Sequence, residues 1–247
     1  MLMEFFYIFL SFALGGILKG ATGAGAPIVA VPIIALFYDV PTAVTVFVVP
    51  NLLSNLWQVW AYRRDQMPPA LSYRLAGTGL VGAAIGTVML AYLPTDFLTM
   101  MVGALVIVYI AFRVAKPDWK LEYAAALRIA VPVGAVAGVL QGAVGISAPV
   151  SLTFLNAMKP ERAQFIATVS LFFIAMAMAQ LPVMIGFGLM TMERFWMSCL
   201  ALIPLVAFMP LGALIARHVP RSVFDKIILV MLSFIAVQLI ANVIAGS

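Results

Sequence analysis

Glycines, prolines and clusters of charge divide the chain into ten apolar segments that contain few polar positions. Most approach the roughly 20 residues that a helix needs to span a bilayer. Segments 26–37 and 148–157 are shorter, and each directly follows a glycine-rich break. Each is predicted to be the returning arm of a re-entrant hairpin, which the membrane tolerates only where it is buried in protein or lines a cavity. The alternative is that each segment crosses the membrane fully. The approximate bounds are 3–18, 26–37, 43–62, 71–92, 97–114, 124–141, 148–157, 162–184, 194–216 and 223–245.

Composition places this pattern in a membrane. Of the 247 residues, 65% are hydrophobic and 9% are charged, and the mean hydropathy is +1.14. A soluble domain carries about 25% charged residues, so the predicted fold class is an all-α polytopic membrane protein. The net charge of +5 then indicates cationic loops on the cytoplasmic face and no nucleic-acid partner.

One glycine-rich phrase occurs twice. Residues 16–27 read GILKGATGAGAP and residues 138–149 read GVLQGAVGISAP, at an offset of 122. Pro41 and Pro160 match at an offset of 119, and GTVMLAYLP and GALIARHVP match at 126. These matches predict an internal duplication, with a first membrane repeat at 1–118, a cytoplasmic linker at 119–122 and a second repeat at 123–247. A chance match of glycines and prolines is the alternative.

Five segments per repeat is an odd number, so the two repeats are expected to be inverted. Counting crossings then puts twelve of the fourteen Lys and Arg residues on one side, which the positive-inside rule makes cytoplasmic, with both termini periplasmic. Arg194 falls on the other side with Glu4, Asp39, Asp96 and Glu193, and Lys19 falls at the break. The twelve are Arg63, Arg64, Arg74, Arg113, Lys116, Lys120, Arg128, Lys159, Arg162, Arg217, Arg221 and Lys226.

Inverted repeats are typical of secondary transporters, whose substrate sites lie near the midplane where helices are broken. The doubled phrase is the predicted break in each repeat, with the two short helices meeting near the midplane. Its glycines at 20, 23, 25, 142 and 145 are expected to allow positive φ and close approach of the backbone to substrate. The alternative is close helix packing, which is favoured for Gly16 and Gly20 taken alone.

The short helices would present their N-terminal ends to the break. Pro27 and Pro149 suit the first turn of a helix, whose free N–H groups and positive dipole end bind anions. Thr22 and Ser147 add hydroxyl donors. The two ends are therefore predicted to form one anion cradle from the backbone around 23–26 and 145–148.

Lys19 follows about fifteen apolar residues. A lysine at that depth costs from about 2.5 kcal/mol upwards, so it needs a partner or a water-filled cavity. The second repeat has Gln141 at the matching position and offers no acid, which makes a bound anion the natural partner. The alternative is snorkelling to the interface.

The third segment carries a polar stripe. Asn51, Asn55 and Gln58 share one helical face, at i, i+4 and i+7. In the eighth segment Gln164 and Thr168 share a face, Ser170 matches Asn51 at the offset of 119, and Gln180 follows. Amides and hydroxyls without carboxylates suit an oxyanion, or they act as interhelical hydrogen bonds.

Several chemistries have no residues to support them. No Asp or Glu lies at a segment centre, and the single histidine, His218, lies beside Arg217 at a helix end. The single cysteine, Cys199, excludes an internal disulfide and is expected to pack in an apolar helix. No HExxH, GxSxG or Walker motif occurs. The chain is predicted to be neither an enzyme nor an ATP-driven pump, with no metal and no cofactor.

The phrases GGILKGATGAGAPIVAVP and AGVLQGAVGISAPVSLTF, with the helix ends GTVMLAYLP and GALIARHVP, resemble the sulfite exporter TauE/SafE family of membrane permeases. The resemblance implies a bacterial inner membrane and a small sulfur-containing anion such as sulfite, sulfoacetate or thiosulfate. Gln141 and Ser147 depart from the first copy's Lys19 and Gly25, which puts the charge symmetry of a site in doubt.

The predicted function is a secondary permease that moves sulfite or an organosulfonate by alternating access. A passive anion channel and a non-transporting scaffold subunit are the alternatives. Membrane lipids are the other expected partners, and a homodimer is left open. The candidate substrate-binding residues are Lys19, Gly20, Thr22, Gly23, Gly25, Pro27, Asn51, Asn55, Gln141, Gly142, Gly145, Ser147, Pro149, Thr168 and Ser170.

Overall fold

The computed structural model describes residues 2–115, 119–218 and 221–245, and this part of the chain forms ten helices and no strand. The ten predicted segments are all helices. Seven are long and apolar enough to cross a membrane: α3, α4, α5, α6, α8, α9 and residues Lys226–Ala245 of α10. This confirms the all-α polytopic membrane protein. The helices are α1 (Leu2–Thr22), α2 (Ala26–Phe37), α3 (Val40–Ala61), α4 (Pro69–Tyr92), α5 (Thr95–Ala115), α6 (Tyr123–Val144), α7 (Ala148–Ala157), α8 (Arg162–Gly186), α9 (Met192–His218) and α10 (Arg221–Ala245).

The breaks lie later in the phrase than the sequence indicated. α1 continues through Lys19 to Thr22, and α6 continues to Val144. The predicted positive φ is therefore wrong for Gly20 and Gly142, which are helical. Positive φ occurs at Gly23 (85°), Gly25 (91°) and Gly145 (71°). Helix α1 continues past Gly20, which packs in helical conformation against the backbone of α9 at Met209. The helix ends at Thr22, directly before Gly23, whose φ is positive.

Helix α2 is enclosed by protein, as the re-entrant prediction requires, whereas α7 is buried only in part. Every residue of α2 from Ala26 to Ala35 is buried. Helix α2 runs back along α1, because Gly15 contacts Ala26 near one end and the Tyr7 ring stacks on Phe37 at the other. At 1.5 Å per residue, α2 is about 18 Å long and α7 about 15 Å, against roughly 30 Å for a hydrocarbon core.

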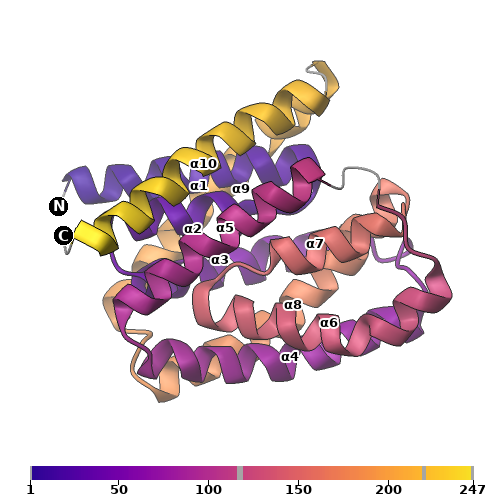
Figure 1. Cartoon of the computed structure of the whole chain (residues 1–247), viewed down its shortest axis with the longest axis horizontal. Coiled ribbons are helices and arrows are strands. Elements are labelled where there is room, and N and C mark those ends of the chain that lie inside the picture. Colours follow the sequence, from indigo (N-terminus) through magenta and orange to yellow (C-terminus); the bar gives the residue numbers. More distant parts are fainter. Residues whose placement is uncertain (1, 116–118, 219–220, 246–247) are drawn as a thin grey trace.

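Corresponding helices of the two halves make corresponding contacts. α1 packs along α9 as α6 packs along α4, while α3 crosses α8 and α5 lies against α10 (Figure 1). The contacts agree in detail: Gly20 faces the Met209 carbonyl, and Gly142 faces the Ala83 carbonyl. The two glycines are 122 residues apart and their partners 126, which are the offsets of the sequence matches. The division at 118 and 123 and the inverted relation of the halves stay predictions.

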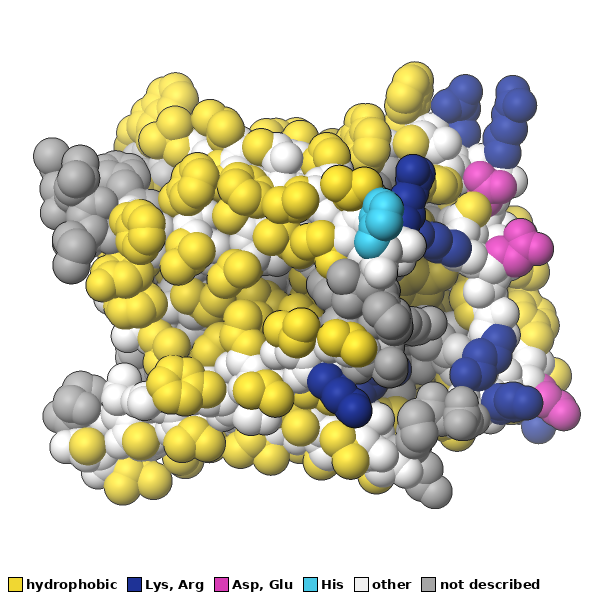
Figure 2. All heavy atoms as spheres, turned by 90° about the horizontal axis from the view of Figure 1, so that it is seen from above, with side chains coloured by type: hydrophobic (Ala, Val, Ile, Leu, Met, Phe, Trp, Pro, Cys, Tyr) yellow, Lys and Arg dark blue, Asp and Glu magenta, His cyan; other side chains and the backbone are white. Residues whose placement is uncertain are grey.

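Charge is distributed along the bundle axis as predicted. Both termini lie at one end of the molecule in Figure 1, and the Lys and Arg side chains visible in Figure 2 gather toward the opposite end. Arg194 is set apart from them and pairs with Asp39, with 3.8 Å between Nη2 and Oδ1. Lys116 lies outside the described residues, as do the side chains of Glu4 and Arg221.

Candidate functional site

Lys19 lies in the last turn of α1 and is only 3% exposed. Its Nζ donates to Asn55 Oδ1 of α3 at 2.8 Å. No carboxylate of the described residues pairs with it. A buried ammonium without a counter-ion is costly.

An amide row on α3 continues from Lys19. Asn55 Nδ2 donates to Asn51 Oδ1 at 2.8 Å and to the Asn51 carbonyl at 2.7 Å. The other end of the row is open: Asn51 Nδ2 is buried and has no hydrogen-bond partner. The Lys19 amine and one unused N–H donor therefore lie within a single hydrogen-bonded group, which we call the Lys19 cluster (Lys19, Asn51 and Asn55).

Polar residues next to the Lys19 cluster hold the turn between α1 and α2 in place. Gln58 Nε2 donates to the Gly23 carbonyl at 3.0 Å, and Ser170 Oγ of α8 donates to Gln58 Oε1 at 3.0 Å. Both bonds are buried. Ser170 thus reaches the turn through Gln58, and the positive φ of Gly23 is fixed by helices from both halves.

Two predicted ligand donors are otherwise engaged. Thr168 Oγ1 accepts the Met67 N–H at 3.1 Å, in the loop before α4. The Thr22 side chain is exposed, and its hydroxyl bonds to the carbonyls of Leu18 and Ala24. These contacts stabilise a loop and a turn, and the structure does not bring either hydroxyl to the Lys19 cluster.

The second break has its own polar group, without charge. Ser147 Oγ donates to Gln141 Oε1 at 2.9 Å, and Ser151 Oγ donates to the Ser147 carbonyl at 2.9 Å. Gln180 Nε2 of α8 donates to the Gln141 carbonyl at 3.2 Å. All four side chains are buried. Gly145 and Pro149 shape this turn, where Pro149 stands in the first turn of α7 as Pro27 does in α2.

The two turns do not form one cradle. Gly23 is bonded to Gln58 near the end of α3, whereas Gly145 packs on Val44 near its start. These α3 positions are fourteen residues apart, or about 21 Å along the helix axis. The short helices do meet, since Gly25 lies against Leu152 of α7. Each starts beside the middle of the other, however, so their N-terminal ends lie at different depths.

The starts of α3 and α8 favour a different alignment of the two halves in this region. The N-caps Asp39 and Glu161 are 122 residues apart, and so are Gln58 and Gln180. At that offset Phe173, and not Ser170, is the counterpart of Asn51. The sequence match relied on a proline pair, whereas the two glutamines at the glycine offset were the available signal. The amide row therefore belongs to the first half alone.

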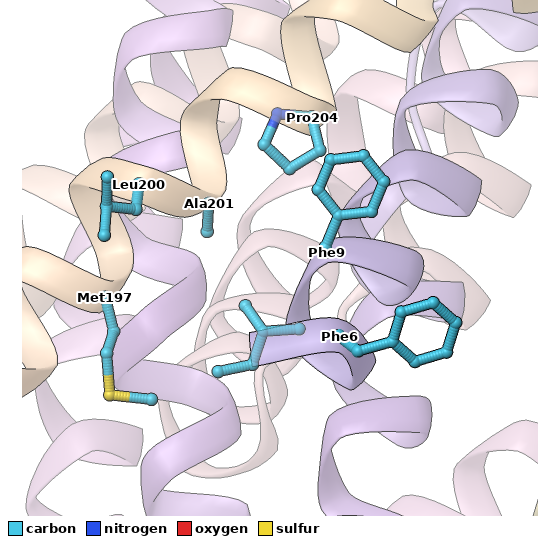
Figure 3. Close-up of a pocket in the computed structure, with 7 residues that line it drawn as sticks. Phe6, Phe9, Met197, Leu200, Ala201 and Pro204 are labelled. Carbon is cyan, nitrogen blue, oxygen red and sulfur yellow. The ribbon is translucent and has the colours of Figure 1, made fainter. Parts of the chain in front are cut away.

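An apolar hollow of about 370 Å³ lies between α1 and α9 (Figure 3). It offers an oxyanion no side-chain donor, and the Lys19 cluster does not line it. No group of His, Cys, Asp or Glu that could hold a metal occurs in the described part of the chain. The hollow is lined by Phe6, Ile8, Phe9, Met197, Leu200, Ala201 and Pro204.

Membrane-spanning helices interrupted by two turns place the chain in the class of polytopic α-helical membrane proteins. The family follows from comparison: residues 8–239 match the family model described as Sulfite exporter TauE/SafE, so the chain belongs to this family of permeases. Searches of curated proteins and of solved structures gave no match.

Proposed function

We propose that this chain is a secondary permease that moves a small sulfur oxyanion, sulfite or an organosulfonate such as sulfoacetate, by alternating access. The observation that carries the proposal is the Lys19 cluster. No carboxylate of the described residues pairs with its ammonium, and the adjacent Asn51 amide lacks an acceptor. An oxyanion supplies both.

The energies favour an anion over an empty site. A buried ammonium without a counter-ion is costly, and a buried donor left without an acceptor costs about 1–3 kcal/mol. One bound oxyanion offsets both costs. The positive end of the α2 dipole at Gly25 adds to the attraction.

The approach to the cluster is also electropositive. Arg162 is exposed at the start of α8, and its Nη2 donates to the carbonyls of Gly20 and Ala21 at 3.2 and 3.3 Å. This places a guanidinium at the end of α1, one turn beyond Lys19, on the side where Lys and Arg gather. We propose that this side is the cytoplasmic face of a bacterial inner membrane.

The test is flux of radiolabelled sulfite into proteoliposomes. Replacing Lys19 with Gln removes a charge-assisted bond of about 1.5–3 kcal/mol, so flux at subsaturating sulfite should fall at least about tenfold. Lys120→Gln is the matched control, since Lys120 is exposed in the linker. Equal flux in Lys19→Gln and the wild type would remove Lys19 from the mechanism.

Two further measurements separate the alternatives. Saturation and counterflow exchange are expected of a permease, and a passive anion channel shows neither. A non-transporting scaffold would give no anion-dependent thermal shift with sulfite, thiosulfate or sulfoacetate. A shift that appears in the wild type and is lost in Lys19→Gln supports the proposed site.

A further inference from the structure

Ser198 of α9 makes a contact with α3 that the candidate site does not include. Its side chain is fully buried. The hydroxyl donates to the Val46 carbonyl at 2.7 Å and accepts the Val49 N–H at 3.3 Å. Both partners lie in the turn of α3 that precedes Pro50, so one hydroxyl from another helix is inserted into the hydrogen-bond ladder of α3.

Pro50 explains why that turn needs an outside partner. A proline inside a helix has no N–H to donate, and its ring crowds the carbonyl four residues earlier. For Pro50 that carbonyl belongs to Val46. Ser198 supplies the missing donor. Water cannot replace it inside a membrane, because the hydrocarbon core of a bilayer contains none.

This arrangement singles out Pro50 among the internal prolines. Among the hydrogen bonds of the described residues, no side chain of another helix donates to the carbonyl four positions before any of the others. The contact is therefore specific to the one proline that adjoins the Lys19 cluster. The other internal prolines are Pro32, Pro132, Pro182, Pro204 and Pro210.

Pro50 directly precedes Asn51, and Asn55 follows one turn later. The direction in which α3 continues after the proline therefore sets where the amide row lies relative to Lys19. We infer that Ser198 is a positioning residue that fixes α3 at Pro50 and thereby aims the Asn51 amide at the anion. This inference rests on the proposed anion site.

A second contact joins the same two helices. Arg194 Nη2 donates to Thr42 Oγ1 at 2.8 Å, one turn before the Ser198 contact along both helices. Hydrogen bonds therefore join α3 and α9 in two successive turns, so α3 is expected to move together with α9. Any movement of α9 during transport would reach the amide row through these bonds.

The second half offers a matched control. Ser72 of α4 is the counterpart of Ser198 at the offset of 126, and it is also buried. Its hydroxyl donates to the Met67 carbonyl of its own loop at 3.2 Å. Helix α8 has Phe172 where α3 has Pro50. Loss of the Ser72 hydroxyl therefore removes a buried bond of the same kind without touching a proline turn.

The experiment measures the dissociation constant for sulfite in detergent, by calorimetry, beside the melting temperature. Ser198→Ala should weaken binding about tenfold, by one charge-free hydrogen bond and the misaimed amide. Ser198→Thr keeps the hydroxyl and should retain binding, and Ser72→Ala should bind as the wild type does. In a Pro50→Ala background, which restores the N–H to α3, Ser198→Ala should cost less affinity.

Two outcomes would overturn the inference while the proposed function stands: wild-type affinity in Ser198→Ala, or equal losses from Ser198→Ala with and without Pro50. If the wild type binds no anion, the proposed function fails instead. Hydrogen exchange then decides the positioning role, because Ser198→Ala should accelerate exchange of the Val49 amide. Exchange as slow as in Ser72→Ala would contradict it.

Discussion

Under the proposed function, Asn51 carries a conflict between stability and binding at the scale of a single residue. Its amide nitrogen is buried without an acceptor, which costs the empty protein about 1–3 kcal/mol. Asn51→Leu removes that donor at similar size, while Asn55 Nδ2 keeps the Asn51 carbonyl as acceptor. The free energy of unfolding should therefore stay level or rise by about 1 kcal/mol, and the thermal shift with sulfite should fall.

Gln58→Leu is the matched control on the same helix. Gln58 is satisfied at both ends, by the Gly23 carbonyl and by Ser170, so its loss leaves a buried carbonyl without a donor. The melting temperature without anion should drop. If Asn51→Leu lowers the melting temperature as much as Gln58→Leu does, the unpaired Asn51 amide does not destabilise the empty protein, and the proposal that it is kept for binding an anion fails.

Candidate site residues could be proposed from sequence, but their hydrogen-bond partners could not be predicted. A lysine deep in an apolar segment and amides at i, i+4 identified Lys19, Asn51 and Asn55, because burial of such groups demands a partner. The sequence could not show that Thr168 and Thr22 serve a loop and a turn. The role of Thr168 depends on where α8 meets the loop before α4, which leaves no periodic pattern in the sequence. Thr22 bonds to carbonyls two and four residues away.

The helices themselves followed from hydrophobic length, and their ends did not. All ten segments are helices, yet α1 and α6 extend three or four residues past the predicted limits. A glycine reads as a helix end in isolation. In a membrane it also lets two helices approach closely, and only the packed partner distinguishes the two roles.

Two glycines of α4 test this at the scale of the element. A Cβ at Gly86 would meet the Val139 carbonyl of α6, whereas a Cβ at Gly77 meets nothing within 4 Å. Gly86→Ala should destabilise the protein by about 1–3 kcal/mol through overpacking. Gly77→Ala should stabilise it by up to about 1 kcal/mol, because alanine favours the helix. Thermal unfolding in detergent measures both.

Opposite signs for two identical substitutions in one helix would show that packing, and not helix propensity, fixes the α4–α6 seam. Equal shifts of either sign would contradict the packing role of Gly86. The same seam exists between α1 and α9, where Gly212 faces the Ile17 carbonyl. Gly212→Ala should therefore destabilise the protein to the extent that Gly86→Ala does.

One part of the course of the chain could be predicted, because charge counts crossings independently of hydrophobicity; the inverted relation of the halves stays a prediction. Arg194 pairing with Asp39, away from the other basic residues, is the detail that a different parity would have broken. The depth of the two turns could not be predicted in this way. Parity is the same whether a short arm stops at the midplane or beyond it, so the expected single cradle had no support from charge.

Orientation in the membrane is the last property of the whole molecule that can be tested directly. With Cys199 replaced by Ser, the chain has no cysteine, and new ones can be placed at Glu193, in the first turn of α9, and at Lys120, in the linker. Both positions are exposed. Because the basic end should face the cytoplasm, an impermeant maleimide added to intact bacteria should label Glu193→Cys and leave Lys120→Cys unlabelled until the cells are opened. The reverse labelling pattern would show that the basic end, with Arg162 beside Lys19, faces outward.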